Sequence, residues 1–124
     1  AQYVAINVEH LMRLPDNFSF VQGAATAETF LTAYQSLFIL AGLKPHQSVL
    51  VHAGASGVGS AAIQLAKACH CYVVTTVGSP EKVQACYDLG VDEVINYREI
   101  DFVDWSKSHQ PKGFDVIVDV PVSI

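Results

Sequence analysis

Hydrophobic positions along the chain follow two periods. Short runs rich in β-branched residues alternate with segments in which apolar residues recur every three or four positions, as on one face of a helix. The connections between them are short, which is typical of a parallel sheet covered by helices on both faces. The pattern therefore predicts an α/β fold of Rossmann-like type, with the order β-α-β-α-β-α-β. The expected elements are strand 48–53, helix 58–69, strand 72–77, helix 81–89, strand 91–96, helix 101–108 and strand 114–120.

A long helix is expected before this alternating region, over residues 24–41. Gly42 and Pro45 follow it, and both residue types are common just after a helix ends. Further upstream, residues 3–8 alternate like a short strand. One helical stripe of this long helix is expected to face the core, and it consists of Phe30, Tyr34, Leu37, Phe38 and Ala41.

Composition narrows the class of protein. The chain has 124 residues, of which 51% are hydrophobic and 15% charged, so it is richer in apolar residues than an average soluble domain. The net charge of -5 and the absence of a basic cluster argue against nucleic acid as a partner. No apolar run approaches the roughly 18 residues of a membrane span, so no membrane association is expected. Three cysteines with C-x-C spacing predict reduced thiols in a cytoplasmic protein rather than disulfides or a metal site.

The stretch GASGVG, residues 54–59, carries the candidate chemistry. Gly54 and Gly59 have the spacing of a mononucleotide P-loop, whereas Gly57, Gly59 and Ala62 have the spacing of a dinucleotide fingerprint. A P-loop requires a lysine after its second glycine to reach the phosphates, and here Ser60 follows. The absence of that cation argues against nucleoside triphosphate chemistry.

The dinucleotide interpretation fits its surroundings better. A strand is expected before the bend and a helix after it, so backbone N–H groups at the helix N-terminus would face a pyrophosphate. The alternative, which the sequence leaves open, is a tight turn that holds no ligand.

The end of the second strand predicts which dinucleotide is bound. An NAD site usually places an acid about 20 residues after the glycines, where it binds the ribose 2′-hydroxyl. Here that position falls near Gly78 and Ser79, and no acid is present. Lys82 can supply a positive charge for a 2′-phosphate, and Tyr97 is expected at the same edge of the sheet. We therefore expect NADP(H), although Lys82 taken alone is more simply an exposed surface lysine.

Several stretches together resemble the medium-chain dehydrogenase/reductase superfamily, in its zinc-independent quinone oxidoreductase (zeta-crystallin-like) branch. They occur in the family's order and spacing, and they cover nearly the whole chain: LMRLPDNFSFVQGAA, ETFLTAYQSLF, GLKPHQSVLVHAGASGVGSAAIQLAK, VGSPEKVQACYDLGVDEVINYREIDF and FDVIVDV. Family members are longer and have two domains. The resemblance therefore implies a fragment in which residues 1–23 end a GroES-like catalytic domain and its hinge, and residues 24–124 form an NADP-binding Rossmann domain that is not complete.

The resemblance also implies a set of cofactor-binding residues. The bend would surround the pyrophosphate, the end of the second strand and the tyrosine of the NYR stretch would bind the 2′-phosphate, and a threonine of the long helix would lie near the nicotinamide. That threonine is equally consistent with an ordinary helix-surface residue. The implied set is Thr32, Gly54, Ala55, Ser56, Gly57, Val58, Gly59, Gly78, Ser79, Lys82 and Tyr97.

The activity that the resemblance implies is hydride transfer from NADPH to a quinone or an α,β-unsaturated carbonyl, by a parent protein that forms homo-oligomers. The residues themselves identify no general acid. His52 and Asp119 lie near the expected crevice, but a histidine satisfied by backbone groups and an exposed aspartate are the simpler interpretations. A nucleotide-binding module without catalysis, or an inactive truncated form, remains the alternative.

Overall fold

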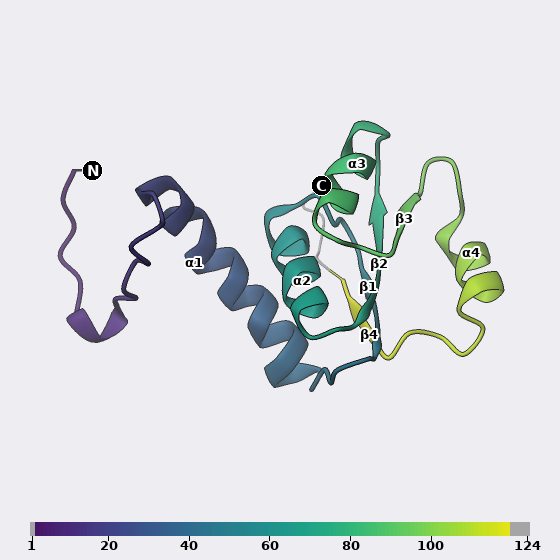
Figure 1. Cartoon of the computed structure of the whole chain (residues 1–124), viewed down its shortest axis with the longest axis horizontal. Helices are drawn as coiled ribbons and strands as arrows, with labels where there is room; N and C mark the ends of the chain where they lie inside the picture. The colour runs from purple at the N-terminus through teal and green to yellow at the C-terminus, as the bar shows by residue number, and fades with distance from the viewer. Residues whose placement is uncertain (1, 120–124) are drawn as a thin grey trace.

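A computed structural model describes residues 2–119. Its body is a parallel sheet of four strands, which lie in the order β3-β2-β1-β4 (Figure 1). This is the order expected for the first half of a Rossmann fold with right-handed crossovers, so the predicted fold class is confirmed. The strands are β1 (Ser48–Val51), β2 (Tyr72–Val77), β3 (Glu93–Asn96) and β4 (Val116–Val118).

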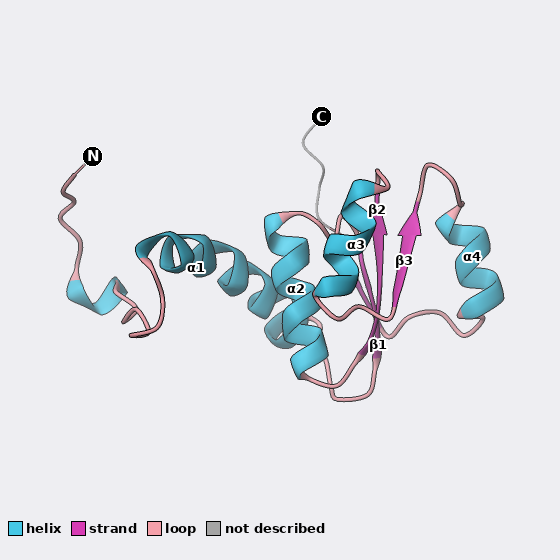
Figure 2. Cartoon of the chain, turned by 45° about the horizontal axis from the view of Figure 1, so that its top comes forward, coloured by secondary structure: helices cyan, strands magenta, loops and turns pink. Residues whose placement is uncertain are grey.

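Helices cover both faces of the sheet, as Figure 2 shows. The main core lies against α2 (Gly57–Ala68) and α3 (Glu81–Asp88), and alternate strand residues such as Val49 and Val51 point into it. The residue between them, Leu50, faces the opposite side. There it joins a smaller cluster beneath α4 (Phe102–His109), formed with Val74, Ile95, Phe102, Trp105 and Phe114.

The long helix begins earlier than predicted. Helix α1 spans Phe20–Tyr34 and starts four residues before the expected position, because Ser19 and Gln22 form a capping box. The Ser19 hydroxyl accepts from the Gln22 N–H at 3.2 Å, and the Gln22 side chain accepts from the Ser19 N–H at 2.9 Å. The predicted boundary at residue 23 therefore falls inside the first turns of α1, and the division into domains stays a prediction.

The last part of this helix is wider than an α-helix. It continues as the π-helix η2 (Gln35–Leu40), in which the Ala41 N–H bonds to the Ser36 carbonyl at 3.1 Å. The predicted stripe along this helix is only partly correct. Leu37 is buried as expected, but Tyr34 is 50% exposed and Ala33 is buried in its place.

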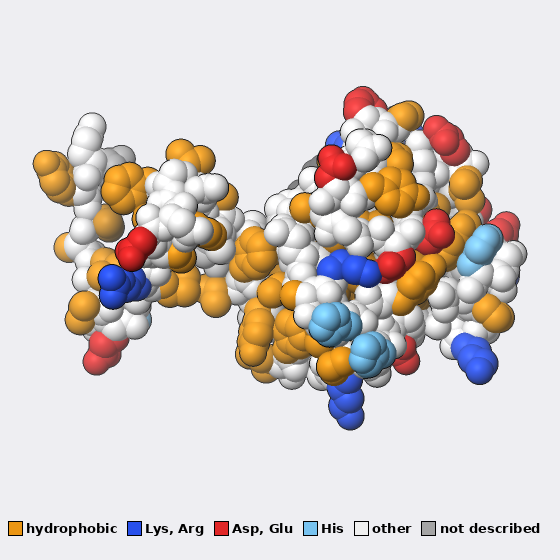
Figure 3. Space-filling view, in the orientation of Figure 1, with side chains coloured by type: hydrophobic (Ala, Val, Ile, Leu, Met, Phe, Trp, Pro, Cys, Tyr) orange, Lys and Arg blue, Asp and Glu red, His pale blue; other side chains and the backbone are white. Residues whose placement is uncertain are grey.

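The N-terminal residues do not form the strand predicted for residues 3–8. They run as an extended arm with one 3₁₀ turn, η1 (Val8–His10), and they lie beside no other strand (Figure 1). A strand is stable only when its backbone groups pair with a neighbour, and the sheet offers none here. Hydrophobic side chains gather on this arm and on the nearby end of the long helix (Figure 3), and Tyr3 and Phe20 are 94% and 89% exposed. Within residues 2–119, no helix is both long and apolar enough to cross a bilayer.

One polar cluster ties α2 to the sheet. The Lys67 ammonium lies 2.8 Å from the Asp92 carboxylate and donates to the Cys71 carbonyl at 3.2 Å. Asp92 also accepts from the buried N–H of Val73 at 2.7 Å. These bonds fix the C-terminal end of α2 against the start of β2. The glycine bend lies at the opposite end of α2, so the same bonds help to position it.

Candidate functional site

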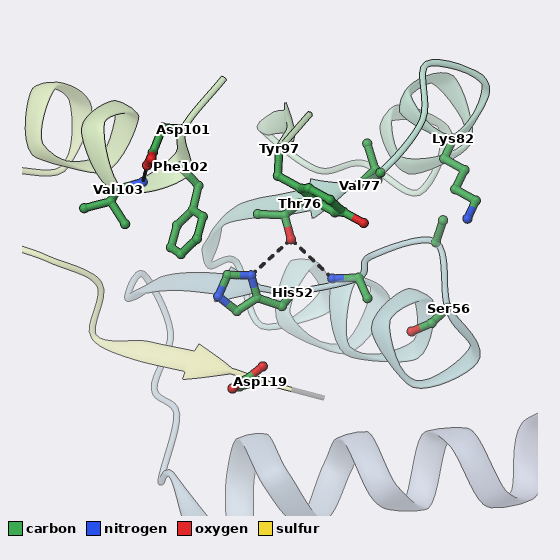
Figure 4. Close-up of a pocket in the computed structure, with 13 residues that line it drawn as sticks. His52, Ser56, Thr76, Val77, Lys82, Tyr97, Asp101, Phe102, Val103 and Asp119 are labelled. Carbon is green, nitrogen blue, oxygen red and sulfur yellow. Dashed lines mark hydrogen bonds between the residues drawn. The ribbon is translucent and has the colours of Figure 1, made fainter. Parts of the chain in front are cut away.

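A cavity of about 760 Å³ opens at the carboxyl ends of all four strands (Figure 4). In open α/β sheets this edge is where ligands bind, since the loops that follow the strands diverge there. The lining residues come from the end of β1, the end of β2, the start of α3, the loop after β3, the start of α4 and the end of β4. Representative members are His52, Thr76, Lys82, Tyr97, Phe102 and Asp119.

The glycine bend follows β1 directly and packs closely against its neighbours. A Cβ on Gly59 would overlap the carbonyl oxygen of Ala53, and a Cβ on Gly54 would overlap the hydroxyl of Thr75. Ala53 itself adopts a left-handed φ of 53°, which turns the chain sharply at the end of the strand. Gly59 thus allows α2 to approach the end of β1 closely, as a dinucleotide fingerprint requires, and Gly54 allows the bend to approach β2.

Ser56 is the N-cap of α2, a role that its place in the bend did not reveal. Its hydroxyl accepts from the Gly59 N–H at 3.1 Å. The first two N–H groups of the helix, those of Gly57 and Val58, bond to no other described residue. The helix terminus therefore presents two free donors rather than three to a ligand.

The end of β2 forms the cationic side of the cavity. Gly78 lies beneath Tyr97 so closely that a Cβ there would overlap the phenolic oxygen. Lys82 and Tyr97 line the cavity from α3 and from the loop after β3, and both point toward the glycine bend in Figure 4. No described carboxylate forms a salt bridge with Lys82. Helix α3 starts at Glu81, as expected, and Pro80 occupies its cap position.

Glu81 modifies the charge on this side. Its pKa is lowered, first by its own backbone N–H, then by the Ser79 hydroxyl, and further by the positive charges of Lys82 and Arg98. The carboxylate therefore stays ionised and shares the surroundings in which a phosphate would be expected. Arg98, one residue beyond Tyr97, contributes to the same local field.

The opposite side of the cavity contains a contact that the sequence did not predict. Nδ1 of His52 lies 3.0 Å from the hydroxyl of Thr76, and the His52 and Phe102 rings form a T-shaped pair with 5.0 Å between their centroids. A partner in the backbone was expected for this histidine, and that expectation is wrong. The one available signal was the pair of polar residues, Thr75 and Thr76, in an otherwise apolar strand.

The predicted site residues fall into three groups. Five line the cavity: Ala55, Ser56, Gly78, Lys82 and Tyr97. Five others lie in or next to the same two loops: Gly54, Gly57, Val58, Gly59 and Ser79. Thr32 lies apart on α1, where its hydroxyl donates to the Glu28 carbonyl at 2.9 Å, so its proposed place near a nicotinamide stays a prediction.

Metal-ligating side chains do not converge in the described part of the chain. Among residues 2–119, no group of three or more His, Cys, Asp or Glu side chains could hold a metal ion. Cys69, Cys71 and Cys86 are free thiols, and burial raises the pKa of the Cys71 and Cys86 thiols. No zinc ligands are therefore assigned among these residues.

Comparison with known proteins gives one family match. The family model described as zinc-binding dehydrogenase matches residues 57–123, just over half of the chain. The human protein named quinone oxidoreductase is 34% identical over 125 residues, which cover 100% of this chain and 38% of that protein. A zebrafish (Danio rerio) protein named synaptic vesicle membrane protein VAT-1 homolog is 37% identical over 95% of this chain and 24% of its own length.

Solved structures agree with this match. The quinone oxidoreductase from Thermus thermophilus, described together with its NADPH complex, superposes with a TM-score of 0.85 at 33% identity, over 97% of this chain and 39% of that one. The CurK enoyl reductase gives a TM-score of 0.87 at 34% identity, over 95% of this chain and 36% of that one. The chain thus spans well under half the length of these relatives. It belongs to the zinc-binding dehydrogenase family, within the medium-chain dehydrogenase/reductase superfamily.

Proposed function

We propose that the chain is the cofactor-binding part of an NADPH-dependent oxidoreductase that reduces a quinone or an enone. The observation that carries the proposal is that Lys82 and Tyr97 line the cavity beside the end of β2, where Gly78 and Ser79 stand in place of an acid. A carboxylate at that position would repel a 2′-phosphate, whereas a lysine attracts one. The quinone oxidoreductase whose structure is described with NADPH has the same fold over this region.

Different residues of the chain bind different parts of the cofactor. The free N–H groups of Gly57 and Val58 donate to the pyrophosphate at the N-terminus of α2. Lys82 and the Tyr97 hydroxyl bind the 2′-phosphate, and Ser79 joins them once its hydroxyl leaves Glu81. The narrow space above Gly78 holds the Tyr97 ring in place.

Quinones and α,β-unsaturated carbonyls are the proposed acceptors. When bound, NADPH supplies the hydride, and the protein positions it and excludes water. Relatives with the names quinone oxidoreductase and enoyl reductase support both acceptor classes. The proposal assigns no proton donor and requires no zinc, and it places the parent protein in the cytoplasm as a homo-oligomer.

Charge reversal at Lys82 tests the cofactor assignment. Lys82→Glu is expected to raise the Kd for NADPH about 10- to 100-fold, since a charge-assisted contact is replaced by repulsion, and to change the Kd for NADH much less. Calorimetric titration of both cofactors measures the difference. Lys44→Glu is the matched control, because Lys44 is an exposed lysine that precedes β1 at the opposite end of the sheet. Equal losses for NADPH and NADH would remove Lys82 from the 2′-phosphate site.

A measurement of turnover distinguishes a reductase from a nucleotide-binding module without catalysis. NADPH oxidation is measured with a panel of quinones and enones, for this chain and for any longer protein that contains it. Binding of NADPH without oxidation in the longer protein would contradict the reductase and favour the module.

A further inference from the structure

Thr76 and His52 form a hydrogen-bonded pair at the end of adjacent strands. The Thr76 hydroxyl lies 3.0 Å from Nδ1 of His52 and 3.3 Å from the backbone nitrogen of Ala53 (Figure 4). Thr76 is only 2% exposed, so its hydroxyl has little access to solvent. The direction of these two bonds fixes the position of a proton on the imidazole.

The direction follows from counting donors. The Ala53 N–H can only donate, so the Thr76 oxygen accepts from it. The hydroxyl has one proton of its own, and within residues 2–119 no other acceptor for that proton is bonded to it. A buried hydroxyl proton without an acceptor is costly, so it is donated to Nδ1 of His52. Nδ1 is then the acceptor, and the neutral ring carries its proton on Nε2.

The ring is also held in orientation. The Phe102 ring packs against it in a T-shaped arrangement, with 5.0 Å between the centroids and an angle of 76° between the planes. Among the described residues nothing is hydrogen-bonded to Nε2, while the side chain of His52 lines the cavity. The imidazole thus presents one directed N–H donor to a ligand, on the side of the cavity away from Lys82 (Figure 4).

We infer that Thr76 is a positioning residue that locks His52 as the Nε2–H tautomer, and that this N–H donates to an acceptor atom of the bound dinucleotide. The inference rests on the proposed function for the identity of the ligand, but the tautomer itself does not depend on it. A second anchor on this side would fix the nucleotide at a point remote from the 2′-phosphate contacts. His52 would therefore affect NADPH and NADH alike, in contrast to Lys82.

The tautomer is tested without cofactor by nitrogen NMR of the imidazole side chains. In the wild-type chain, His52 is expected to show a protonated Nε2 and an unprotonated Nδ1, and Thr76→Val is expected to produce a mixture of the two tautomers. Thr76→Ser retains the hydroxyl and should restore the wild-type signature. Thr75→Val is the matched control, because the Thr75 hydroxyl donates to the Val51 carbonyl at 2.7 Å and not to His52. An Nδ1–H tautomer in the wild type, or no change in Thr76→Val, would overturn the lock.

Binding tests the contact with the ligand. Thr76→Val and His52→Phe are each expected to raise the Kd for NADPH and for NADH about three- to tenfold, the effect of one lost hydrogen bond. The Kd of the double variant for either cofactor should be no higher than that of His52→Phe alone, because Thr76 acts through His52. If NADPH binds and Lys82→Glu weakens it while His52→Phe does not, the contact is wrong and the proposed function stands. If the wild-type chain binds neither cofactor, both the proposed function and the contact fail.

Discussion

At the scale of single residues, one hydroxyl in the glycine bend competes with the ligand that the bend is proposed to bind. Ser56 accepts from the Gly59 N–H, one of the donors that a helix N-terminus would otherwise offer to phosphate. The serine stabilises the helix start in the free chain, and the pyrophosphate is left with the N–H groups of Gly57 and Val58.

Replacement of Ser56 should separate these two effects. Ser56→Ala removes the cap and is expected to lower the free energy of unfolding by about 1 kcal/mol, whereas Ser56→Gly should cost only a few tenths. The Kd for NADPH should not rise in either variant, since the freed Gly59 N–H becomes available to the phosphate. Urea unfolding and calorimetric titration measure the two quantities. A weaker affinity in both variants would show instead that the Ser56 hydroxyl itself contacts the cofactor.

Glu81 provides a second prediction at this scale. Its carboxylate remains ionised because its own N–H, the Ser79 hydroxyl and the nearby cations lower its pKa, so it competes with a 2′-phosphate for the same groups. Glu81→Gln is therefore expected to lower the Kd for NADPH about two- to fivefold, the range of an exposed ion pair, and to leave NADH binding unchanged. Glu93→Gln, at the opposite end of the sheet, is the control. An unchanged Kd for NADPH would exclude this competition.

At the scale of elements, one carboxylate strengthens the contact between the start of β1 and the residues that lead into β4. Asp115 accepts from both the N–H and the hydroxyl of Ser48, each at 2.8 Å, and the chain returns a bond from the Asp115 N–H to the Ser48 carbonyl at 3.1 Å. These donors lower the pKa of Asp115. Strands that lie 67 residues apart in sequence are thereby joined at the end of the sheet opposite the cavity.

This contact makes stability depend on pH in a defined direction. The folded-state pKa of Asp115 lies below its unfolded value of about 3.9, so the contact stabilises the fold above that pH and is lost as the pH falls through the folded pKa. Asp115→Asn should therefore have a lower free energy of unfolding than the wild type near neutral pH, and this difference should become smaller on acidification. Chemical unfolding at several pH values measures the difference. A difference that does not change with pH would contradict a stabilising role for the ionised Asp115 carboxylate.

A comparison of the predicted and observed elements shows how much of the fold and of the site could be predicted from the sequence. Periodicity and short connections were sufficient for the sheet and its order, because right-handed crossovers leave few topologies for four parallel strands. The alternation in residues 3–8 was misleading, because a strand also requires a neighbour that sequence alone does not supply. Lys82 and Tyr97 could be placed in one site because they follow adjacent strands. The bond between His52 and Thr76 could not, because it depends on side-chain directions across two strands.

At the scale of the whole molecule, the chain consists of an α/β body and an apolar arm that contributes little to it. The arm before Ser19 is largely exposed, and its hydrophobic side chains lie on the surface shown in Figure 3. Exposed apolar surface of this kind promotes association. The body has its own core between the sheet and its helices.

Removal of residues 1–18 should therefore leave the body intact. The Ser19 capping box is retained, so the free energy of unfolding is expected to change by less than about 0.5 kcal/mol. The Kd for NADPH should be unchanged, and the average mass from light scattering should decrease if the wild-type chain associates through the arm. A large loss of stability would show that the arm belongs to the folded unit.

The close contact between Gly78 and Tyr97 bears on how cofactor preference can evolve. Any side chain at position 78 would displace the phenolic oxygen of Tyr97. Every glycine codon becomes an acidic codon by one change at its second base. Such a change would introduce a carboxylate beside the ribose and remove the tyrosine from the phosphate in the same step. A single mutation at Gly78 would thus move the cavity away from the proposed preference for NADP(H) and toward NAD(H).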